Sequence, residues 1–356
     1  MSQFAIAIPT YQRPGLLRLL IEDIARQSLL PERVIVIDGD PKSKAVIAIL
    51  NSLQQELPFP VACIPSNHGN LAYQRYLGWR CASGFDPEFL VYFDDDIRLK
   101  DQNTLSELLA GFEDAAVVGA TARTVTGGLE KFSNEPALMD MRTAAKSNWL
   151  VNVLGTARKY PPGGYTPVGN RIFPDKGEPI SRVEWLQGRV MAYRMSALDP
   201  SCFLEDLFAL THIRCGLGED SILSRQVGRK GKLILFQNLN IEHPDDAMPN
   251  SYPTRAYQLG YATAYSRRFL NDHYRVVEPP HFSDRVDLLK SYLGNNLINL
   301  ARALARPRRH RFAYAWGYFV GSLRGVLQKP SARSLAPGID WWQDAEAALA
   351  GQVVLS

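Results

Sequence analysis

Four short apolar runs alternate with segments of helical periodicity over the first hundred residues, and this alternation constrains the fold more than any other feature of the sequence. The runs are Phe4–Ile8, Val34–Ile37, Val61–Ile64 and Phe89–Phe93. Strands that alternate with helices in this way build a parallel sheet from βαβ units. We therefore expect an α/β protein with a mostly parallel, Rossmann-like central sheet flanked by helices.

Carboxylates directly follow two of these runs. One run ends at Asp94–Asp96 and another ends at Asp38. Ligands of open parallel sheets bind beyond the carboxyl ends of the strands, so these acids are expected at a binding edge. Three adjacent anions repel one another unless a cation neutralises them, and a divalent ion with oxygen ligands is the simplest candidate. The alternative is a solvated turn in which one Asp caps the following helix.

The later part of the chain has a less regular pattern. Residues 115–125 predict a pair of strands, residues 183–193 another strand, and residues 232–236 a last one; a helix is expected over residues 221–227. Residues 126–179 are rich in Gly and Pro and weakly periodic, which is typical of a functional loop or flap. We expect one domain over residues 1–249 and a basic, aromatic-rich helical C-terminal extension over 250–356.

Charge and motifs exclude several classes of function. The formal net charge of +4 is too small to indicate nucleic-acid binding. Neither a dinucleotide fingerprint nor a P-loop follows the first apolar run. The four cysteines form no C-x-x-C pair, and no basic segment precedes the first apolar run, so we expect buried thiols in a cytoplasmic protein.

Seven motifs, in this order, together resemble glycosyltransferase family 2. They are IPTYQRP, VIVIDGD, NHGNLAYQRYLGWRCA, FLVYFDDDI, WLQGRVMAYR, GLGEDSILSRQVGRKGKL and IEH, and they span about Phe4 to His243. The resemblance implies a GT-A nucleotide-sugar-binding fold. It also implies inverting transfer of a sugar from a nucleoside-diphosphate sugar to a sugar, glycan or lipid-linked acceptor, in glycan, polysaccharide or glycolipid biosynthesis.

The resemblance also assigns residues to the donor side. Asp38 is expected to accept hydrogen bonds from the nucleotide base. Asp96, in the D-x-D element, and His243 are the expected ligands of Mn²⁺ or Mg²⁺, and the ion would neutralise charge on the departing nucleotide. Asp94 is expected to face the donor sugar or ribose, whereas Asp95 serves mainly the local fold. The expected donor-binding residues are Pro9, Thr10, Tyr11, Arg13, Asp38, Asn70, Arg75, Asp94 and Asp95.

On the acceptor side, the resemblance makes Asp220 the general base that removes the proton from the acceptor hydroxyl. The alternative is that Asp220 only stabilises a helix N-terminus. Trp185 offers a flat ring on which a sugar can stack, unless it is a core residue. The expected acceptor-binding residues are Trp185, Gln187, Gly188 and Glu219.

Two positions depart from the family pattern. Tyr76 stands where the family usually has Asn, which puts the contacts of the preceding Arg75 in doubt. Asp40 stands where the family often has Ser and adds a carboxylate near the base pocket.

Two other functions compete with this interpretation. The sequence Asp38-Gly39-Asp40 after an apolar strand also matches the start of a haloacid-dehalogenase-type, Mg²⁺-dependent phosphatase. Against this, Pro41 replaces the Thr or Val expected there, and a full strand–helix unit precedes the motif. The third interpretation is a non-catalytic nucleotide-sugar-binding subunit, against which the retained acids argue.

The C-terminal extension places a basic cluster beside an aromatic segment. Residues 306–311 hold four Arg, and residues 312–320 are apolar and aromatic. This pattern favours peripheral contact of residues 306–327 with the cytoplasmic face of a membrane. The alternative is a helical appendage that packs on the catalytic domain or on a second subunit of a homo-oligomer.

Overall fold

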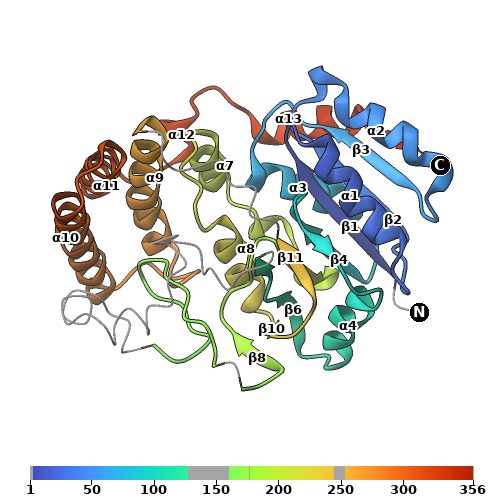
Figure 1. Cartoon of the computed structure of the whole chain (residues 1–356), viewed down its shortest axis with the longest axis horizontal. Coiled ribbons are helices and arrows are strands. Elements are labelled where there is room, and N and C mark those ends of the chain that lie inside the picture. The colour runs from blue at the N-terminus through green and yellow to red at the C-terminus, as the bar shows by residue number, and fades with distance from the viewer. Residues whose placement is uncertain (1–2, 127–159, 176, 244–252, 356) are drawn as a thin grey trace.

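The computed structural model describes residues 3–126, 160–175, 177–243 and 253–355, and a nine-stranded sheet forms its centre (Figure 1). Its strands are β1 Phe4–Thr10, β2 Arg33–Asp38, β3 Val61–Pro65, β4 Phe89–Phe93, β6 Val117–Ala122, β8 Ile180–Val183, β9 Val190–Arg194, β10 Lys232–Phe236 and β12 Val353–Leu355. Their order is β12-β3-β2-β1-β4-β9-β6-β10-β8. β1 to β4 are parallel, β6 is parallel to β10, and β8, β9 and β12 are antiparallel to their neighbours. The predicted α/β class with a mostly parallel core is confirmed.

Helices cover both faces of the sheet. On one face lie α1 Pro14–Ala25, α2 Ala45–Leu53 and α4 Thr104–Ala110; on the other lie α3 Leu71–Ala82, α7 Glu205–His212, α8 Glu219–Gly228 and α13 Trp341–Ala350. Successive residues of β1 alternate between the two cores: Ile6 packs in one, and Ala5 and Ala7 pack in the other. Burial on both faces explains why the strands are continuous apolar runs.

The helix α3 lies unusually close to β1. A Cβ at Gly78 would come within 2.9 Å of the Ala7 Cβ, so glycine lets the helix and strand approach. Arg75 lies one turn earlier on α3 and is only 2% exposed. The close packing therefore brings a buried guanidinium group to the sheet.

A second, three-stranded sheet lies beside the central one. It contains β5 Arg98–Leu99, β11 Ile241–His243 and β7 Val125–Thr126, with β11 in the middle. β11 pairs with β5 through Glu242 and Arg98, which brings His243 next to the residues that follow β4. The strand pair predicted over 115–125 is thus divided between two sheets. The single strand predicted over 183–193 is wrong, because a turn separates β8 from β9.

The C-terminal extension is helical, as predicted, but its last residues return to the sheet. α9 Pro253–Asp272, α10 Phe282–Ala305 and α11 Arg309–Leu327 stand together at one end of the molecule, on the left of Figure 1. After the short helix α12 Ala332–Leu335, α13 packs on α3, and β12 pairs antiparallel with β3. The sequence did not predict this return, and the domain boundary at residues 249/250 stays a prediction.

Within the described ranges, no helix has both the length and the apolar character needed to cross a membrane.

The structure describes only part of the loop predicted over 126–179, because residues 127–159 and 176 lie outside the described residues. Its described part forms a turn in which Tyr165 and Arg171 pair as an isolated β-bridge.

Candidate active site

The carboxyl ends of β1 and β4 are joined by charged and polar contacts. The Thr10 hydroxyl donates to Asp95 Oδ2 at 2.7 Å, and Arg13 Nη1 lies 3.3 Å from Asp95 Oδ1 and 2.8 Å from Asp96 Oδ2. Asp95 is 5% exposed, and burial raises its pKa although Thr10 and Arg13 oppose this. Through these contacts with Thr10 and Arg13, Asp95 connects the ends of β1 and β4.

Asp96 and His243 form the pair predicted to bind a metal ion. His243 Nε2 lies 3.3 Å from Asp96 Oδ1, yet this buried oxygen makes no hydrogen bond with any described residue. Two ligand atoms of one octahedral ion about 2.1 Å away lie about 3 Å apart, so the spacing fits a shared cation. Burial acts to raise the pKa of Asp96, but His243 and Arg13 outweigh it and hold that pKa below its usual range.

Asp96 and His243 are two candidate protein ligands, and the described residues add no third one to them. In the part of the chain that the structure describes, no group of three or more His, Cys, Asp or Glu side chains converges as it would in a site built from protein ligands alone. An ion held by Asp96 and His243 therefore takes its other oxygen ligands from elsewhere. A carboxylate and an imidazole with open positions beside them fit Mn²⁺ or Mg²⁺ that also contacts a substrate phosphate.

Arg75 connects the aspartate triplet to the later motifs. Its Nη2 lies 3.2 Å from Asp94 Oδ1 and donates to the Gly188 carbonyl at 3.0 Å, and its Nη1 pairs with Glu219. Burial raises the pKa of Asp94 to about 7, against the opposing charge of Arg75. Burial and the neighbouring Asp220 also raise the pKa of Glu219, against Arg75. The Arg75 guanidinium thus contacts a residue directly after β4, a residue of the β8–β9 turn and a residue of α8.

Asp220 lies in the first turn of α8, behind this cluster. Its Oδ2 accepts from the Gly188 amide at 2.7 Å, and its Oδ1 pairs with Arg171. Burial opposes ionisation, but Arg171 and Arg75 outweigh it and lower the pKa of Asp220. Asp220 is therefore held as a carboxylate. A helix N-terminus alone does not explain its contacts, because both oxygens are held by groups outside α8.

Gly188 lies between the two charged groups. Its amide donates to Asp220 and its carbonyl accepts from Arg75. A Cβ here would come within 2.9 Å of Asp220 Oδ2 and 3.0 Å of Arg75 Nη2. The absence of a side chain therefore lets the backbone contact both.

The residues predicted to bind the nucleotide base lie at the ends of β1 and β2. Asp38 is 2% exposed, and its Oδ1 accepts from the Asp40 amide at 2.9 Å. Burial raises the pKa of Asp38; the hydrogen bond from Asp40 opposes this, and the Asp40 charge adds to it. The Tyr11 ring is 51% exposed and lies against Gly69, where a Cβ would come within 2.7 Å of it. An exposed ring thus lies over these strand ends.

Two predicted contacts do not agree with the structure. Asn70 is 1% exposed; its Oδ1 caps α3 at the Tyr73 amide (3.2 Å) and its Nδ2 donates to the Phe208 carbonyl (2.7 Å), so no part of it faces a nucleotide. Trp185 is fully buried, with its ring against Phe173 and its Nε1 donating to the Gly164 carbonyl. It presents no stacking face, so it is a core residue.

The two remaining predicted residues, Pro9 and Gln187, are both buried. Pro9 is buried within β1. Gln187 is 9% exposed, and its buried Oε1 has no hydrogen-bond partner among the described residues.

Tyr76 and Arg171 show what sequence reasoning missed. Tyr76, the departure from the family pattern, packs edge-on to Trp342 of α13 with ring centroids 5.0 Å apart, while Arg75 keeps its acidic partners. Arg171 pairs with Asp220, donates to the Ser221 hydroxyl at 2.9 Å and lies over the Trp185 ring. No motif marks Arg171, because it stands alone in an irregular segment.

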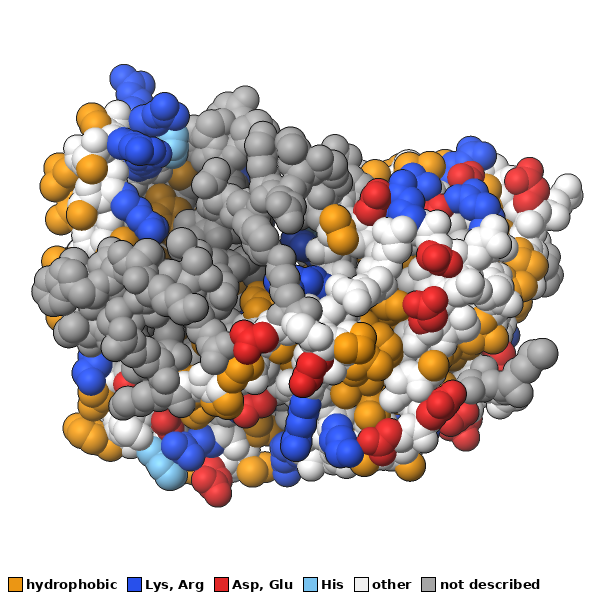
Figure 2. All heavy atoms as spheres, turned by 60° about the horizontal axis from the view of Figure 1, so that its bottom comes forward, with side chains coloured by type: hydrophobic (Ala, Val, Ile, Leu, Met, Phe, Trp, Pro, Cys, Tyr) orange, Lys and Arg blue, Asp and Glu red, His pale blue; other side chains and the backbone are white. Residues whose placement is uncertain are grey.

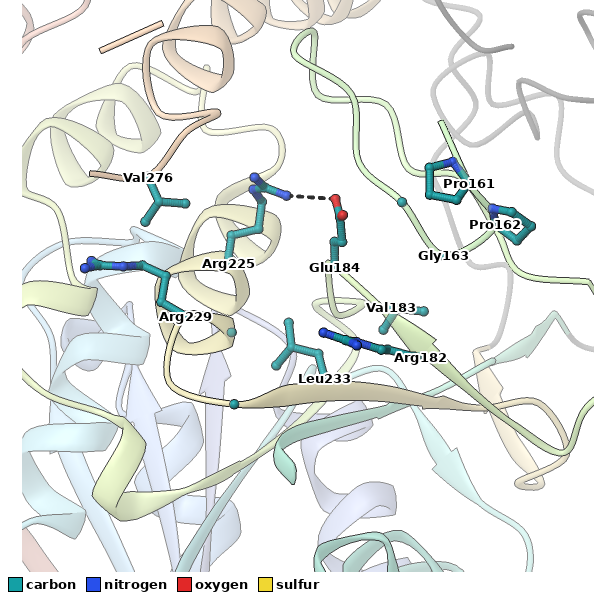
Figure 3. Close-up of a pocket in the computed structure, with 13 residues that line it drawn as sticks. Pro161, Pro162, Gly163, Arg182, Val183, Glu184, Arg225, Arg229, Leu233 and Val276 are labelled. Atoms are coloured by element: carbon teal, nitrogen blue, oxygen red, sulfur yellow. Dashed lines mark hydrogen bonds and ion pairs between the residues drawn. The ribbon is translucent and has the colours of Figure 1, made fainter. Parts of the chain in front are cut away.

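A cleft of about 420 Å³ opens at the C-terminal half of α8, away from these carboxylates. Figure 3 shows Arg225 joined to Glu184 across it, with Arg182 and Arg229 nearby. Arg225 Nη2 also contacts the Tyr274 carbonyl. None of the predicted site residues lines this cleft.

Comparison with known proteins identifies the class. The family model described as glycosyl transferase family 2 matches residues 5–173. These residues are therefore a glycosyltransferase family 2 domain, and the protein is a glycosyltransferase. Asp220 and His243 lie after the matched residues. No curated protein matches the chain significantly.

Solved structures resemble the chain only distantly. Mannosyltransferase PcManGT from Pyrobaculum calidifontis, in complex with GDP-Man and Mn²⁺, is 14% identical over 91% of this chain and 87% of its own, with a TM-score of 0.48. S. aureus TarS 1-349 in complex with UDP-GlcNAc is 12% identical over 91% of this chain and 92% of its own, with a TM-score of 0.45. Similarity of this degree carries no argument about function.

Proposed function

We propose that the protein is a metal-dependent, inverting glycosyltransferase that moves a sugar from a nucleoside-diphosphate sugar to an acceptor hydroxyl. The observation that carries this proposal is the pair formed by Asp96 Oδ1 and His243 Nε2, linked through Asp94, Arg75 and Gly188 to the ionised Asp220. A glycosyltransferase family 2 domain supplies the sheet edge on which these groups meet.

Asp96 and His243 would hold the Mn²⁺ or Mg²⁺ ion. Bound there, the ion would supply charge neutralisation for the diphosphate of the leaving group. Arg13 already balances Asp96 Oδ2, which leaves Oδ1 as the free ligand atom. The exposed Tyr11 ring and the Asp38 carboxylate would bind the nucleoside, and Asp94, beside Arg75, would face the donor sugar or ribose.

Asp220 would act as the general base. The acceptor hydroxyl gives its proton to an Asp220 oxygen while the acceptor oxygen forms a bond to the anomeric carbon. The bond from that carbon to the phosphate oxygen breaks on the opposite face, so the configuration inverts. Arg171 and Arg75 keep Asp220 ionised before the reaction. Gln187 Oε1, buried and without a described partner, would accept from an acceptor hydroxyl, and Gly188 and Glu219 would position Arg75 and Asp220.

Sugar transfer and donor hydrolysis from UDP-, GDP- and dTDP-sugars with Mn²⁺ test this function. We expect Asp220→Asn to lower turnover by about 10²- to 10⁴-fold while nucleotide binding, followed by thermal shift, is kept. Asp206→Asn is a matched control, because Asp206 is also an acid in the first turn of a helix, α7. Unchanged turnover in Asp220→Asn would exclude the base role. Absence of turnover in the wild type with every donor, despite nucleotide binding, would favour the non-catalytic alternative.

The phosphatase alternative receives no support from the fold, because residues 5–173 are a glycosyltransferase family 2 domain. Hydrolysis of p-nitrophenyl phosphate with Mg²⁺ that depends on Asp38 would contradict this conclusion.

A further inference from the structure

The hairpin of α10 and α11 exposes two stripes of large apolar side chains. On α10 they are 49% to 64% exposed: Leu289, Leu293, Leu297, Leu300 and Leu304. On α11 they are 42% to 76% exposed: Phe312, Trp316, Phe319, Leu323, Val326 and Leu327. Spacings of three and four place each set on one face of its helix. Together we call them the hairpin face.

The two stripes lie side by side. Asn296 Nδ2 donates to the Ser322 hydroxyl at 3.2 Å, and Tyr292 packs against Gly325, so the helices are antiparallel and these residues mark their contact. At about 100° per residue, the α10 stripe lies about 20–100° round the helix from Asn296, and the α11 stripe about 40–140° in the same sense from Ser322. In an antiparallel pair, rotation in the same sense turns both stripes toward the same side. The hairpin face is therefore continuous.

The contact with the rest of the protein uses other residues of the hairpin. Tyr318 of α11 and Leu288 and Tyr292 of α10 are buried with Ala264 of α9. Since α9 lies on that side, the hairpin face looks away from the sheet, at the outer end of the molecule in Figure 1. Isolated exposed apolar residues are ordinary, but a continuous patch of eleven large side chains on a folded chain indicates a binding surface.

The charge of this region is entirely of one sign. Residues 288–339 contain nine Lys and Arg and no Asp or Glu. At the turn of the hairpin, Arg302, Arg306, Arg308 and Arg309 are exposed and have no ion-pair partner among the described residues. Figure 2 shows basic side chains gathered at the end of the molecule where α10 and α11 lie, close to exposed hydrophobic side chains.

We propose that the hairpin face is a docking surface for a membrane that contains anionic lipids, on which α10 and α11 lie flat. Apolar side chains enter the boundary between headgroups and acyl chains, and the arginines contact the lipid phosphates. A second copy of the chain fits less well, because its own residues 288–339 would bring another nine cations and no acids. The proposal extends the predicted contact of residues 306–327 to α10, and it does not depend on the transferase proposal.

Vesicle flotation of the full chain tests the proposal. We expect binding to phosphatidylcholine vesicles that contain phosphatidylglycerol, much weaker binding to phosphatidylcholine alone, and release as salt is raised. At about 1 kcal/mol per cation near an anionic surface, Arg306→Gln/Arg308→Gln/Arg309→Gln should lower the partition coefficient by about 100-fold. Trp316→Gln/Leu323→Gln should lower it by about tenfold or more, because half-exposed apolar groups no longer enter the bilayer boundary.

Matched controls lie elsewhere on the same chain. Arg182→Gln/Arg229→Gln removes exposed arginines at the cleft of Figure 3, and Val277→Gln removes an apolar side chain that is 67% exposed. Both should bind vesicles as the wild type does. No binding by the wild type, or equal losses in variants and controls, would overturn the proposal. So would sedimentation showing a wild-type dimer that Trp316→Gln/Leu323→Gln dissociates, because the face would then be a subunit interface.

Discussion

The carboxyl edge of the sheet and the α10–α11 hairpin are both rich in arginine, but the arginines of the two regions differ in whether they contact acidic side chains. At the edge, Arg13, Arg75 and Arg171 each contact a carboxylate. At the turn of the hairpin, Arg302, Arg306, Arg308 and Arg309 have no ion-pair partner among the described residues, and large apolar side chains near them are exposed. Charges satisfied within the fold indicate a site built to orient groups, whereas unsatisfied charges beside apolar groups indicate that the partner is external.

The largest effect on activity is expected in the aspartate triplet. Asp96→Ala should lower turnover by about 100-fold or more, since it removes one of the two proposed metal ligands. Asp95→Ala should act mainly on stability, because Asp95 holds Thr10 and Arg13. Turnover at saturating Mn²⁺, with unfolding in urea measured in parallel, separates the two. Asp114→Asn, a change to an exposed acid paired with Lys232, is the control. Equal losses of turnover at Asp94, Asp95 and Asp96 would contradict the assigned geometry.

Two tryptophans test the contrast between the buried and exposed parts of the C-terminal extension. Trp341 of α13 is fully buried beside Tyr73 and Phe208, whereas Trp316 of α11 is 60% exposed. Trp341→Ala should lower the free energy of unfolding by about 3–5 kcal/mol, and Trp316→Ala should change it by about 0.5 kcal/mol at most. Urea denaturation measures both. A comparable loss in Trp316→Ala would show that the hairpin face is covered within the protein.

Arg171→Ala should leave the buried Asp220 carboxylate without its nearest cation and lower the free energy of unfolding by about 3 kcal/mol at neutral pH. Because the folded-state pKa of Asp220 is depressed, the stability that Arg171 gives is complete above the unfolded pKa of about 3.9 and is lost as pH falls through the folded value. Urea denaturation should therefore show a difference in the free energy of unfolding between wild type and variant, and this difference should become smaller below about pH 4. A difference that does not change with pH would exclude a contribution of Asp220 ionisation to the stability that Arg171 gives.

Among the variants of the candidate site, the smallest loss of stability is expected at the turn between β8 and β9. Gly188→Ala should displace Asp220 or Arg75 by a few tenths of an ångström and cost about 1–3 kcal/mol of stability. Its turnover should fall more than its nucleotide affinity, because the proposed donor pocket lies at other strand ends. Gly177→Ala, where a Cβ meets nothing within 4 Å, is the control. A loss of nucleotide affinity alone would place Gly188 on the donor side.

The sheet and the positions of its acids follow from the sequence for a simple reason. Strands buried on both faces are continuous apolar runs, and parallel strands end at one edge, so the pattern of residues suffices to place Asp38 and Asp94–Asp96 there. The position of Asn70 favours a role as a helix cap over nucleotide binding, since an Asn directly before a helical run is a preferred N-cap.

Other features could not be predicted, because residue type alone does not separate the alternatives. A tryptophan is equally suited to a core and to a sugar platform, and Trp185 was settled only by burial. Arg171 contacts Asp220 across a long sequence separation, with no periodic pattern around it. β12 has three residues, too few to show a period of two.

The pairing of β12 with β3 affects how the chain is made. Val61 to Cys63 lie opposite Val353 to Leu355, which are synthesised much later. During translation, β3 is therefore an unprotected edge strand throughout the synthesis of the intervening chain, open to pairing with other nascent chains. Contacts of such high sequence separation close late and slow the final folding step. The side of the sheet that contains β3 is thus synthesised well before β12 and is among the last parts of the sheet to be completed.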